Sequence, residues 1–375
     1  MRILIISDVT SWMPGGVPAE TRDLINGLAG RGHAVAFAGD APLQGAEAAR
    51  HFEITVPIDA GFGAQVRRAI ETFAPEVVHV ICMSSRGVLA MLPALGASRW
   101  LLTVHSVPPY ERKFRRWHGH EGLHYAARAL RFLPHSLAWR WLLRGGKIPG
   151  VVVHSEFVAR IMARYGLPEK RSHLIPLPFH PRAGAGGGGL RRAAADELRL
   201  VTVAGLAHTK GQHDVVTALP ALLQRFPRLR YQMIGEVRDE SYVRWLIRLA
   251  NDLGIADRLI ITPDLTQDAK TSALAGADVY VQPSHEEGFC LAFAEAAALV
   301  GRLVGADAGA IAAMSRDDPG AIVVPIRDPV AIARAVARLL DTDLPAGHMA
   351  DRAARLAARF SYERYLLAHE HLYAA

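Results

Sequence analysis

The sequence is poor in cysteine and lacks any long hydrophobic run, and each absence excludes a class of protein. Cys82 and Cys290 are the only cysteines, and neither lies in a ligand-like spacing. Such a chain does not form a disulfide scaffold and suits a reducing compartment. No apolar run reaches the ~20 residues of a membrane span, and the chain opens directly on a strand-like stretch, MRILIISD. We therefore expect no signal peptide or transmembrane anchor, and a cytoplasmic protein that is at most peripheral at the inner face of the membrane.

The length and composition favour a globular protein with two domains. Half of the residues are apolar (50%) and 21% are charged, which is ordinary for a folded chain in water. We find no internal repeat of short period. Because 375 residues exceed the usual size of one hydrophobic core, two domains are expected.

Positive charge is concentrated in one segment. The formal net charge is +7, and residues 111–147 hold nine Lys or Arg against two Glu, a local excess of +7. Aromatic residues are interleaved with these cations: Phe114, Trp117, Phe132, Trp139 and Trp141. Rings at a membrane boundary with cations facing phosphate suit anionic headgroups, so we expect contact with an anionic membrane surface and not with nucleic acid. A solvated basic helix with aromatic residues packed inward is the plain alternative.

The first half of the chain alternates between strand and helix patterns. MRILIIS is followed by a loop with Pro14-Gly15-Gly16, a helical pattern over 21–32 and the strand HAVAFAGD, which is the building block of a parallel sheet. Further strands are expected at 77–82, 100–105 and 151–155. Residues 182–197, RAGAGGGGLRRAAADE, have no apolar period and are interpreted as a linker that ends a first domain at 1–181.

The same alternation restarts after the linker and predicts a second domain over 198–357. Strands are expected at 198–205, 229–236, 258–262, 278–284, 302–307 and 321–325, with helices at 212–226, 245–253, 272–275 and 330–340. The fold class is therefore α/β, with two doubly wound, Rossmann-like domains. Ligands of such domains bind outside the carboxyl ends of the strands, so a cleft between the domains is the expected site.

Residues 286–298, EEGFCLAFAEAAA, keep two acids in an apolar, Ala-rich stretch. The buried strand DVYVQPS precedes this stretch, and a helix is expected from Cys290. The unpaired N–H groups at a helix start attract phosphate. Glu287 lies beside that start, and Glu295 lies about two turns into the helix on the same broad face. Phosphate and hydroxyl-binding carboxylates together indicate a sugar-nucleotide pocket. A capped helix with a surface Glu is the alternative.

The stretch and its surroundings resemble the family 4 retaining glycosyltransferases, which have the GT-B fold. A strand that ends in Pro-Ser is followed by E-G-F and by a second Glu eight residues after the first. The resemblance extends over nearly the whole chain through weaker motifs: Pro14-Gly15-Gly16, LLTVHS (101–106), VVVHSEFVARIM (151–162), LIPLP (174–178), AGLAHTKGQHDVVTAL (204–219) and FSYERYLLAHEHLY (360–373). It implies an acceptor-binding first domain, a nucleotide-sugar-binding second domain, and a closing helix over 358–375 that returns to the first.

The resemblance also implies roles for single residues. Glu287 would bind the donor sugar, and Glu295 the ribose. Lys210 would neutralise the leaving diphosphate, an electrostatic effect of several kcal/mol in a dry cleft. His105 would lie near donor and acceptor. The remaining donor-binding residues implied are Gly15, Gly16, Gly288, Phe289 and Cys290.

The resemblance also implies that the chain needs no metal, because Lys and the helix start would take the metal's role. No cofactor is expected either, since the nucleoside diphosphate sugar is a substrate. Plain alternatives exist for each residue: a turn lysine for Lys210, a core or loop histidine for His105, a simple turn for Gly15-Gly16, and an exposed helix residue for Glu295.

The chain departs from the family pattern in three places. The Arg that commonly precedes the Lys is missing, and His208 or Arg302 is a weak candidate to replace it. Val300 and Arg302 stand where Gly-x-Pro is usual, and residues 309–313, GAIAA, lack the usual Glu. The donor contacts are therefore less secure than the fold.

A competing motif lies at residues 120–124, HEGLH, which fits the H-E-x-x-H pattern of zinc hydrolases. Gly122 weakens a helix there and no third ligand is evident, so we disfavour it. We expect a glycosyltransferase that moves a hexose, with retention, from a nucleoside diphosphate sugar to a lipid-linked acceptor in polysaccharide or glycolipid assembly. A catalytically weakened sugar-nucleotide-binding protein is the main alternative, ahead of a sugar-nucleotide epimerase.

Overall fold

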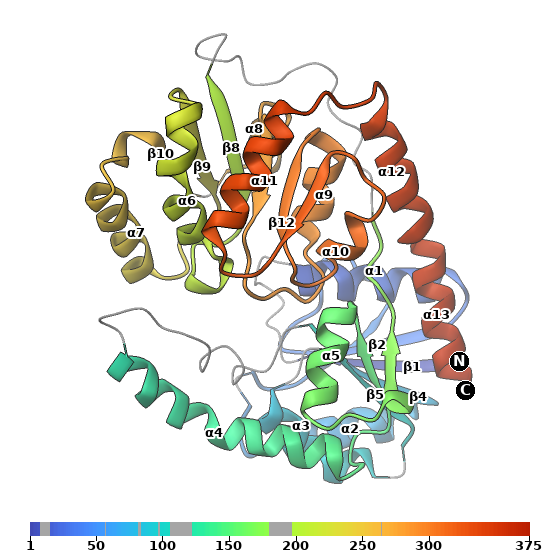
Figure 1. Ribbon diagram of the computed structural model, residues 1–375. Coiled ribbons are helices and arrows are strands. Elements are labelled where there is room, and N and C mark those ends of the chain that lie inside the picture. Colours follow the sequence, from blue (N-terminus) through green and yellow to red (C-terminus); the bar gives the residue numbers. More distant parts are fainter. Residues whose placement is uncertain are drawn as a thin grey trace. The chain divides into compact units, whose positions relative to one another are not determined.

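The chain folds into two compact units, which are described separately here (Figure 1). The computed structural model describes residues 1–7, 16–56, 58–81, 84–96, 98–105, 122–179, 197–263 and 265–375, and of residues 122–132 only the backbone. Unit 1 consists of Met1–Leu177 and Tyr362–Ala375, and unit 2 of Pro178–Ser361. These divisions lie four residues from the expected boundaries at 181 and 357. Nearly all of the expected linker lies outside the described residues.

Unit 1 contains a seven-stranded parallel sheet in the order β3-β2-β1-β4-β5-β6-β7. Its strands are β1 (Arg2–Ser7), β2 (Ala34–Gly39), β3 (Arg50–Glu53), β4 (Val77–Ile81), β5 (Trp100–Val104), β6 (Val151–Val153) and β7 (Ser172–Leu174). Its helices are α1 (Gly16–Gly30), α2 (Phe62–Phe73), α3 (Ser85–Leu95), α4 (Gly122–Arg144), α5 (Glu156–Arg164), the 3₁₀ turn η1 (Glu169–Arg171) and α13 (Tyr362–Ala374).

Unit 2 contains a six-stranded parallel sheet in the order β10-β9-β8-β11-β12-β13. Its strands are β8 (Leu198–Val203), β9 (Leu229–Ile234), β10 (Leu259–Thr262), β11 (Val279–Gln282), β12 (Leu303–Ala306) and β13 (Ala321–Val324). Its helices are α6 (Gln212–Arg225), α7 (Glu240–Asp252), α8 (Gln267–Ala275), α9 (Leu291–Leu299), α10 (Ile311–Met314), α11 (Pro329–Asp341) and α12 (His348–Arg359), with 3₁₀ turns η2 (His208–Lys210) and η3 (Ala256–Arg258).

The sequence explains these elements through burial and capping. Every residue of β4, β5, β6 and β11 is buried, as expected for strands covered on both faces by helices. Several helices begin where a side-chain oxygen accepts from a backbone N–H of the first turn, as Ser155 does for Val158 and Asp239 for Tyr242. The predicted pair of doubly wound, Rossmann-like domains is confirmed.

The local predictions fail in three places. β3 has two exposed and two partly buried residues and no strong apolar pattern, so the sequence did not indicate it. The family motif LIPLP (174–178) implies a strand, but β7 ends at Leu174, because Pro176 and Pro178 have no N–H for a ladder. The strand expected over 151–155 ends at Val153, because Ser155 caps α5.

The strand order fixes where a ligand of each unit would bind. In both sheets the order reverses beside the first strand, between β1 and β4 in unit 1 and between β8 and β11 in unit 2. Ligands of doubly wound sheets bind outside the carboxyl ends of the strands at such a switch point. In unit 2 the two segments that leave this point contain Lys210 and Glu287.

Candidate functional site

Lys210 and Glu287 form an ion pair at the switch point of unit 2. Lys210 ends η2, which follows β8, and Glu287 lies in the loop between β11 and α9. The Lys210 Nζ lies 2.7 Å from the Glu287 Oε1, and both side chains are largely buried. Burial alone would lower the pKa of Lys210, but the Glu287 carboxylate raises it overall, so the ammonium stays charged. The structure therefore brings two of the predicted catalytic residues together.

Gly211 allows the two loops to approach each other. It adopts a left-handed conformation with φ of 70°, and a Cβ at this position would lie 2.1 Å from the Pro283 carbonyl oxygen. The loops are further joined by the His285 N–H, which donates to the Thr209 carbonyl at 2.9 Å. Only glycine satisfies both the conformation and the space, so the Lys-Gly dipeptide places the cation beside Glu287.

The predicted phosphate site at the start of α9 has an open helix end. Cys290 is the N-cap residue, adopts φ of 84°, and gives the helix no side-chain cap. Phe289 and Cys290 are buried, and the Phe289 carbonyl accepts from the Ala310 N–H at 2.9 Å. Gly309 packs so tightly here that a Cβ would lie 2.7 Å from the Glu287 Cβ. The GAIAA loop thus still supports Glu287, although it lacks the family's acid.

The second acid has a different cation partner. Glu295 lies in the middle of α9, and its Oε2 is 3.1 Å from the Lys270 Nζ on α8. Glu287 lies in the loop before the helix and pairs with Lys210. The two acids therefore occupy different microenvironments, and this suits their expected binding of different hydroxyl groups.

His105, the third predicted catalytic residue, belongs to unit 1 and follows β5 directly. Its Nδ1 lies 3.1 Å from the Glu20 Oε2 of α1, and the His154 Nε2 at the end of β6 lies 3.2 Å from the Glu20 Oε1. The sequence did not indicate Glu20 or His154, because residues 85 and 49 positions from His105 share no motif with it. Gly16 begins α1. Gly15, His120 and Glu121 lie outside the described residues, and of residues 122–124 only the backbone is described.

Family models match both units. The model described as "Glycosyltransferase Family 4" matches residues 14–182, and the model described as "Glycosyl transferases group 1" matches residues 191–357. The chain belongs to glycosyltransferase family 4. The resemblance drawn from the E-G-F motif is therefore confirmed. The family match does not support the zinc hydrolase that the HEGLH motif suggested as an alternative.

Curated relatives of this family 4 chain share part of its sequence. A D-inositol 3-phosphate glycosyltransferase of Salinispora tropica is 37% identical over 161 residues, covering 41% of this chain and 33% of the relative. One of Streptomyces coelicolor is 28% identical over 228 residues, covering 58% and 43%. The chain thus spans less than half the length of these relatives.

Solved structures of low sequence identity share the fold over the whole chain. Sucrose-phosphate synthase from Thermosynechococcus elongatus has a TM-score of 0.76 at 19% identity and covers 100% of this chain and 98% of its own. HepE of Anabaena, in complex with UDP-glucose, has a TM-score of 0.76 at 17% identity and covers 100% of both chains. These similarities support the GT-B architecture.

An arginine that the sequence did not indicate lies near Lys210 in space. The side chain of Arg238, from the loop after β9, lies against Gly205, where a Cβ would be 2.7 Å from the Arg238 Nε. Arg238 is close enough to Lys210 to oppose its positive charge and lower its pKa. Arg302, a weak candidate for a diphosphate partner, instead donates to the carbonyls of Leu339 and Thr342, and this does not support that role.

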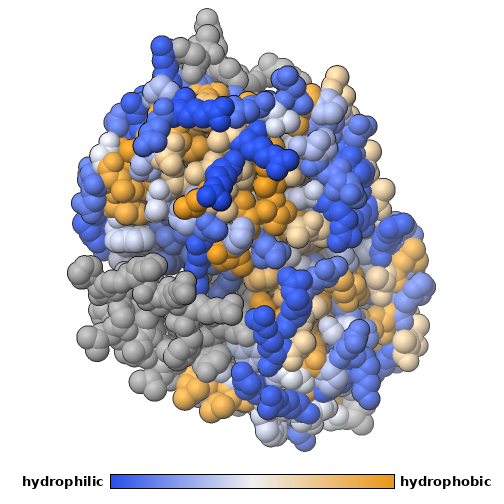
Figure 2. All heavy atoms as spheres, viewed as in Figure 1, coloured by the Kyte–Doolittle hydropathy of each residue, from blue (hydrophilic) through white to orange (hydrophobic). Residues whose placement is uncertain are grey.

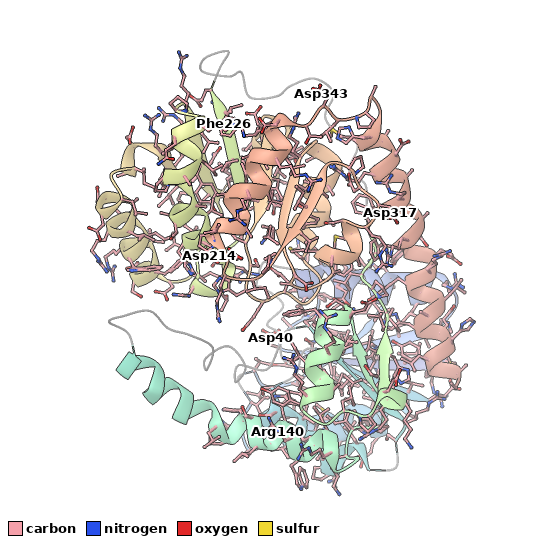
Figure 3. All side chains as sticks on the ribbon, viewed as in Figure 1. Asp40, Arg140, Asp214, Phe226, Asp317 and Asp343 are labelled. Carbon is pink, nitrogen blue, oxygen red and sulfur yellow. The ribbon has the colours of Figure 1, made fainter. Side chains whose placement is uncertain are left out.

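A buried histidine cluster lies behind Lys210 in this family 4 chain. The His285 Nε2 is 2.6 Å from the Oδ2 of Asp214, which Figure 3 labels, and the Arg327 Nε donates to the His285 Nδ1 at 3.1 Å. Burial, with a smaller contribution from the nearby His285, lowers the pKa of His208 to about 4, so its ring is neutral at pH 7 and a poor diphosphate partner.

Two groups of three side chains place potential metal-ligating atoms within 4.8 Å of one another: His208, His213 and His285 in unit 2, and Glu20, His105 and His154 in unit 1. In the first group both nitrogens of His285 already have partners, one of them the cationic Arg327, which opposes a metal ion. In the second group the carboxylate lies between two rings at ion-pair distance. Neither arrangement is assigned to a metal.

Proposed function

We propose that this family 4 chain is a retaining hexosyltransferase that uses a UDP-sugar donor. The observation that carries the proposal is the Lys210–Glu287 ion pair at the switch point, beside the open start of α9. A diphosphate at that helix start would be bound by backbone N–H groups and by Lys210. The choice of uridine is supported by HepE of Anabaena, which binds UDP and UDP-glucose on the same fold.

The chemistry needs charge stabilisation at the leaving group. The acceptor hydroxyl oxygen bonds to the anomeric carbon from the face that UDP leaves, the bond from that carbon to the phosphate oxygen breaks, and the hydroxyl proton passes to the phosphate. Lys210 and Arg238 would stabilise the negative charge that builds on the diphosphate. Two protein cations and a helix start together supply the charge that a metal provides elsewhere, so the proposed reaction needs no metal.

The donor assignment is tested with UDP and a variant of the expected ribose ligand. We expect UDP to stabilise the purified protein, by about 2.7 kcal/mol at a hundredfold excess over its Kd. Glu295→Ala removes hydrogen bonds to a charged group, worth about 1.5–3 kcal/mol, and should weaken the UDP Kd about 10- to 100-fold in isothermal titration. Glu240→Ala, an exposed acid on α7 paired with Arg244, is the control and should leave the Kd unchanged. Tight binding of GDP or ADP in place of UDP, or an unchanged Kd in Glu295→Ala, would contradict the assignment.

A catalytically weakened binding protein remains the second candidate, because the chain departs from the family pattern at three positions. Slow hydrolysis of a UDP-hexose by the purified enzyme separates the two. The Lys210–Glu287 pair and the arginine beside it favour turnover.

We further propose a lipid-linked acceptor at an anionic membrane surface, in polysaccharide or glycolipid assembly. The second half of α4 exposes an apolar ridge at four-residue spacing, formed by Leu133, Leu137 and Trp141. One cation lies beside this ridge, since the Lys147 Nζ is 5.6 Å from the centre of the Trp141 ring. Arg140 (Figure 3) instead stacks inward on Tyr165. Figure 2 shows apolar atoms at the lower edge of the view, where α4 lies in Figure 1. Within the described residues, no helix is long and apolar enough to cross a membrane.

The membrane proposal predicts binding to anionic vesicles that depends on the α4 ridge. We expect sedimentation with phosphatidylcholine vesicles that contain phosphatidylglycerol, and little with phosphatidylcholine alone. Leu137→Ser should weaken this binding several-fold, because it removes an apolar side chain that is 58% exposed. Val330→Ser is a matched control, since Val330 is also 58% exposed but lies on α11. Equal effects of the two variants, or no binding by the native chain, would contradict the proposal. An acceptor such as the phosphorylated inositol named for the relatives would then be favoured.

A further inference from the structure

A carboxylate buried in unit 1 lies between two histidine rings. Glu20, in the second turn of α1, has its Oε2 3.1 Å from the His105 Nδ1 and its Oε1 3.2 Å from the His154 Nε2. The two rings lie beside each other with their centres 4.8 Å apart. Both contacts are at ion-pair distance without the alignment of a hydrogen bond. A buried carboxylate is costly unless charges compensate it, so the protonation of the two rings matters.

The proton positions on His154 follow from its two neighbours. The His154 Nδ1 lies 2.7 Å from the Ile175 carbonyl oxygen, which only accepts, so this nitrogen carries a proton. The His154 Nε2 faces the Glu20 carboxylate. A second proton on this nitrogen prevents its lone pair from facing a lone pair of the carboxylate oxygen. Burial would lower the pKa of His154, but Glu20 raises it overall, as expected for an imidazolium paired with a carboxylate. Burial would raise the pKa of Glu20, yet His105 and His154 lower it to about 2.

A third contact fixes the carboxylate from the last helix. The Tyr365 hydroxyl of α13 donates to the Glu20 Oε1 at 3.1 Å, and both residues are buried. Neither family model extends beyond residue 357, so this contact comes from a segment outside both matches. Glu20 is thus held by His154 from the sheet and by Tyr365 from α13.

His105 is then left with one nitrogen for a substrate. Because His154 is cationic, its charge cancels that of the Glu20 carboxylate. A positive charge on His105 is therefore not needed to compensate the carboxylate. Burial lowers the pKa of His105 to about 4, so its ring is neutral at pH 7. The carboxylate 3.1 Å from Nδ1 favours the tautomer with the proton on that nitrogen, which leaves a lone pair on Nε2. The His105 Nε2 is buried, in a side chain only 9% exposed, and has no hydrogen-bond partner among the residues that the structure describes.

We propose that Glu20 is a positioning residue that holds His105 in the Nδ1–H tautomer, so that the His105 Nε2 accepts a hydrogen bond from a substrate hydroxyl. His154 and Tyr365 act one step further away, by fixing the carboxylate. The proposal rests on the proposed hexosyl transfer for its substrate hydroxyl, but the tautomer itself is a property of the free protein. It differs from the sequence expectation, which placed His105 near the sugar and gave it no partner.

The tautomer is measured by ¹⁵N NMR on the full chain with ring-labelled histidine, using His105→Gln to assign the signals. At pH 7 we expect His105 to show a protonated Nδ1 and an unprotonated Nε2. Glu20→Gln should mix the tautomers and lower the kcat for UDP-hexose turnover at least about tenfold, with the UDP Kd unchanged, because its expected ligands lie in unit 2. Tyr365→Phe removes one hydroxyl and should give a smaller loss of kcat.

The outcomes separate this inference from the proposed function. Absence of turnover and UDP binding in the native protein, with His105 in the expected tautomer, would refute the function and keep the tautomer assignment. An Nε2–H tautomer in the native protein would overturn the inference even if Glu20→Gln does not fold. So would an unchanged kcat in folded Glu20→Gln. Stoichiometric zinc in the purified chain, lost in Glu20→Gln, would also overturn it, because the metal and not the carboxylate would then set the ring.

Discussion

Replacing Lys210 with Met is expected to lower the kcat for UDP-hexose turnover by about 10²- to 10³-fold, the size of effect seen when one preorganised donor to developing negative charge is lost. Lys210 is the cation at the switch point of unit 2 and lies beside the start of α9. The Lys210 side chain stays protonated because the Glu287 carboxylate raises its pKa. A large share of the loss should therefore appear in kcat, since negative charge on the diphosphate grows as the anomeric bond breaks.

The Lys210→Met variant has a second consequence for the donor sugar. The Glu287 carboxylate would lose the ammonium 2.7 Å away and remain largely buried. Without the ammonium the carboxylate is less firmly held in place for the sugar hydroxyls, so KM for the UDP-hexose should rise together with the fall in kcat.

Three variants test this expectation. Lys210→Arg keeps the charge and should recover part of the kcat. Arg238→Ala should have a smaller effect than Lys210→Met, because Arg238 is half exposed and also paired with Glu236. Arg225→Met removes a surface cation paired with Asp341 and should change neither parameter. A folded Lys210→Met enzyme with native kcat would refute the electrostatic role of this lysine.

The sequence was most informative where a motif lies on adjacent strands of the sheet. Lys210 and Glu287 are 77 positions apart, yet both follow strands at one switch point, and the family resemblance implied their proximity by giving both residues to the same donor. Arg238 and Glu20 could not be found in this way. The position of the Arg238 side chain depends on the space that Gly205 leaves. The contacts of Glu20 depend on the direction in which its side chain leaves α1, toward the ends of two strands. Contacts of this kind are set by packing and leave no fixed spacing in the chain.

One departure from the family pattern lies in a tightly held segment after α9. Val300 stands where the family usually has glycine, and its side chain is buried while its carbonyl accepts from the Arg352 guanidinium. The segment after α9 is thus held by a cation from α12, 52 positions away. The family motif gives no sign of this contact, which predicts a large loss of stability when Arg352 is replaced.

Replacing Arg352 with Met is expected to lower the free energy of unfolding by about 3–5 kcal/mol, the usual cost of removing one partner of a buried ion pair. Arg352 and Asp318 are both only 1% exposed in their side chains, and the guanidinium donates to both carboxylate oxygens. It also donates to backbone carbonyls at the end of α9: Ala297, Val300 and Gly301. Removing it leaves a buried carboxylate and helix-end carbonyls without their donor. Urea titration measures the change.

The neighbouring Arg355 provides the matched control for this prediction. It lies on the same helix, 3.9 Å from the Asp318 Oδ2, but its side chain is 41% exposed. Arg355→Met should therefore cost less than about 1 kcal/mol. The double variant Arg352→Met with Asp318→Asn should be more stable than Arg352→Met alone, because the unpaired buried charge is gone. If Arg352→Met and Arg355→Met lower the stability equally, the buried pair does not hold α12 to the end of α9, and the packing of apolar residues between these helices must do so instead.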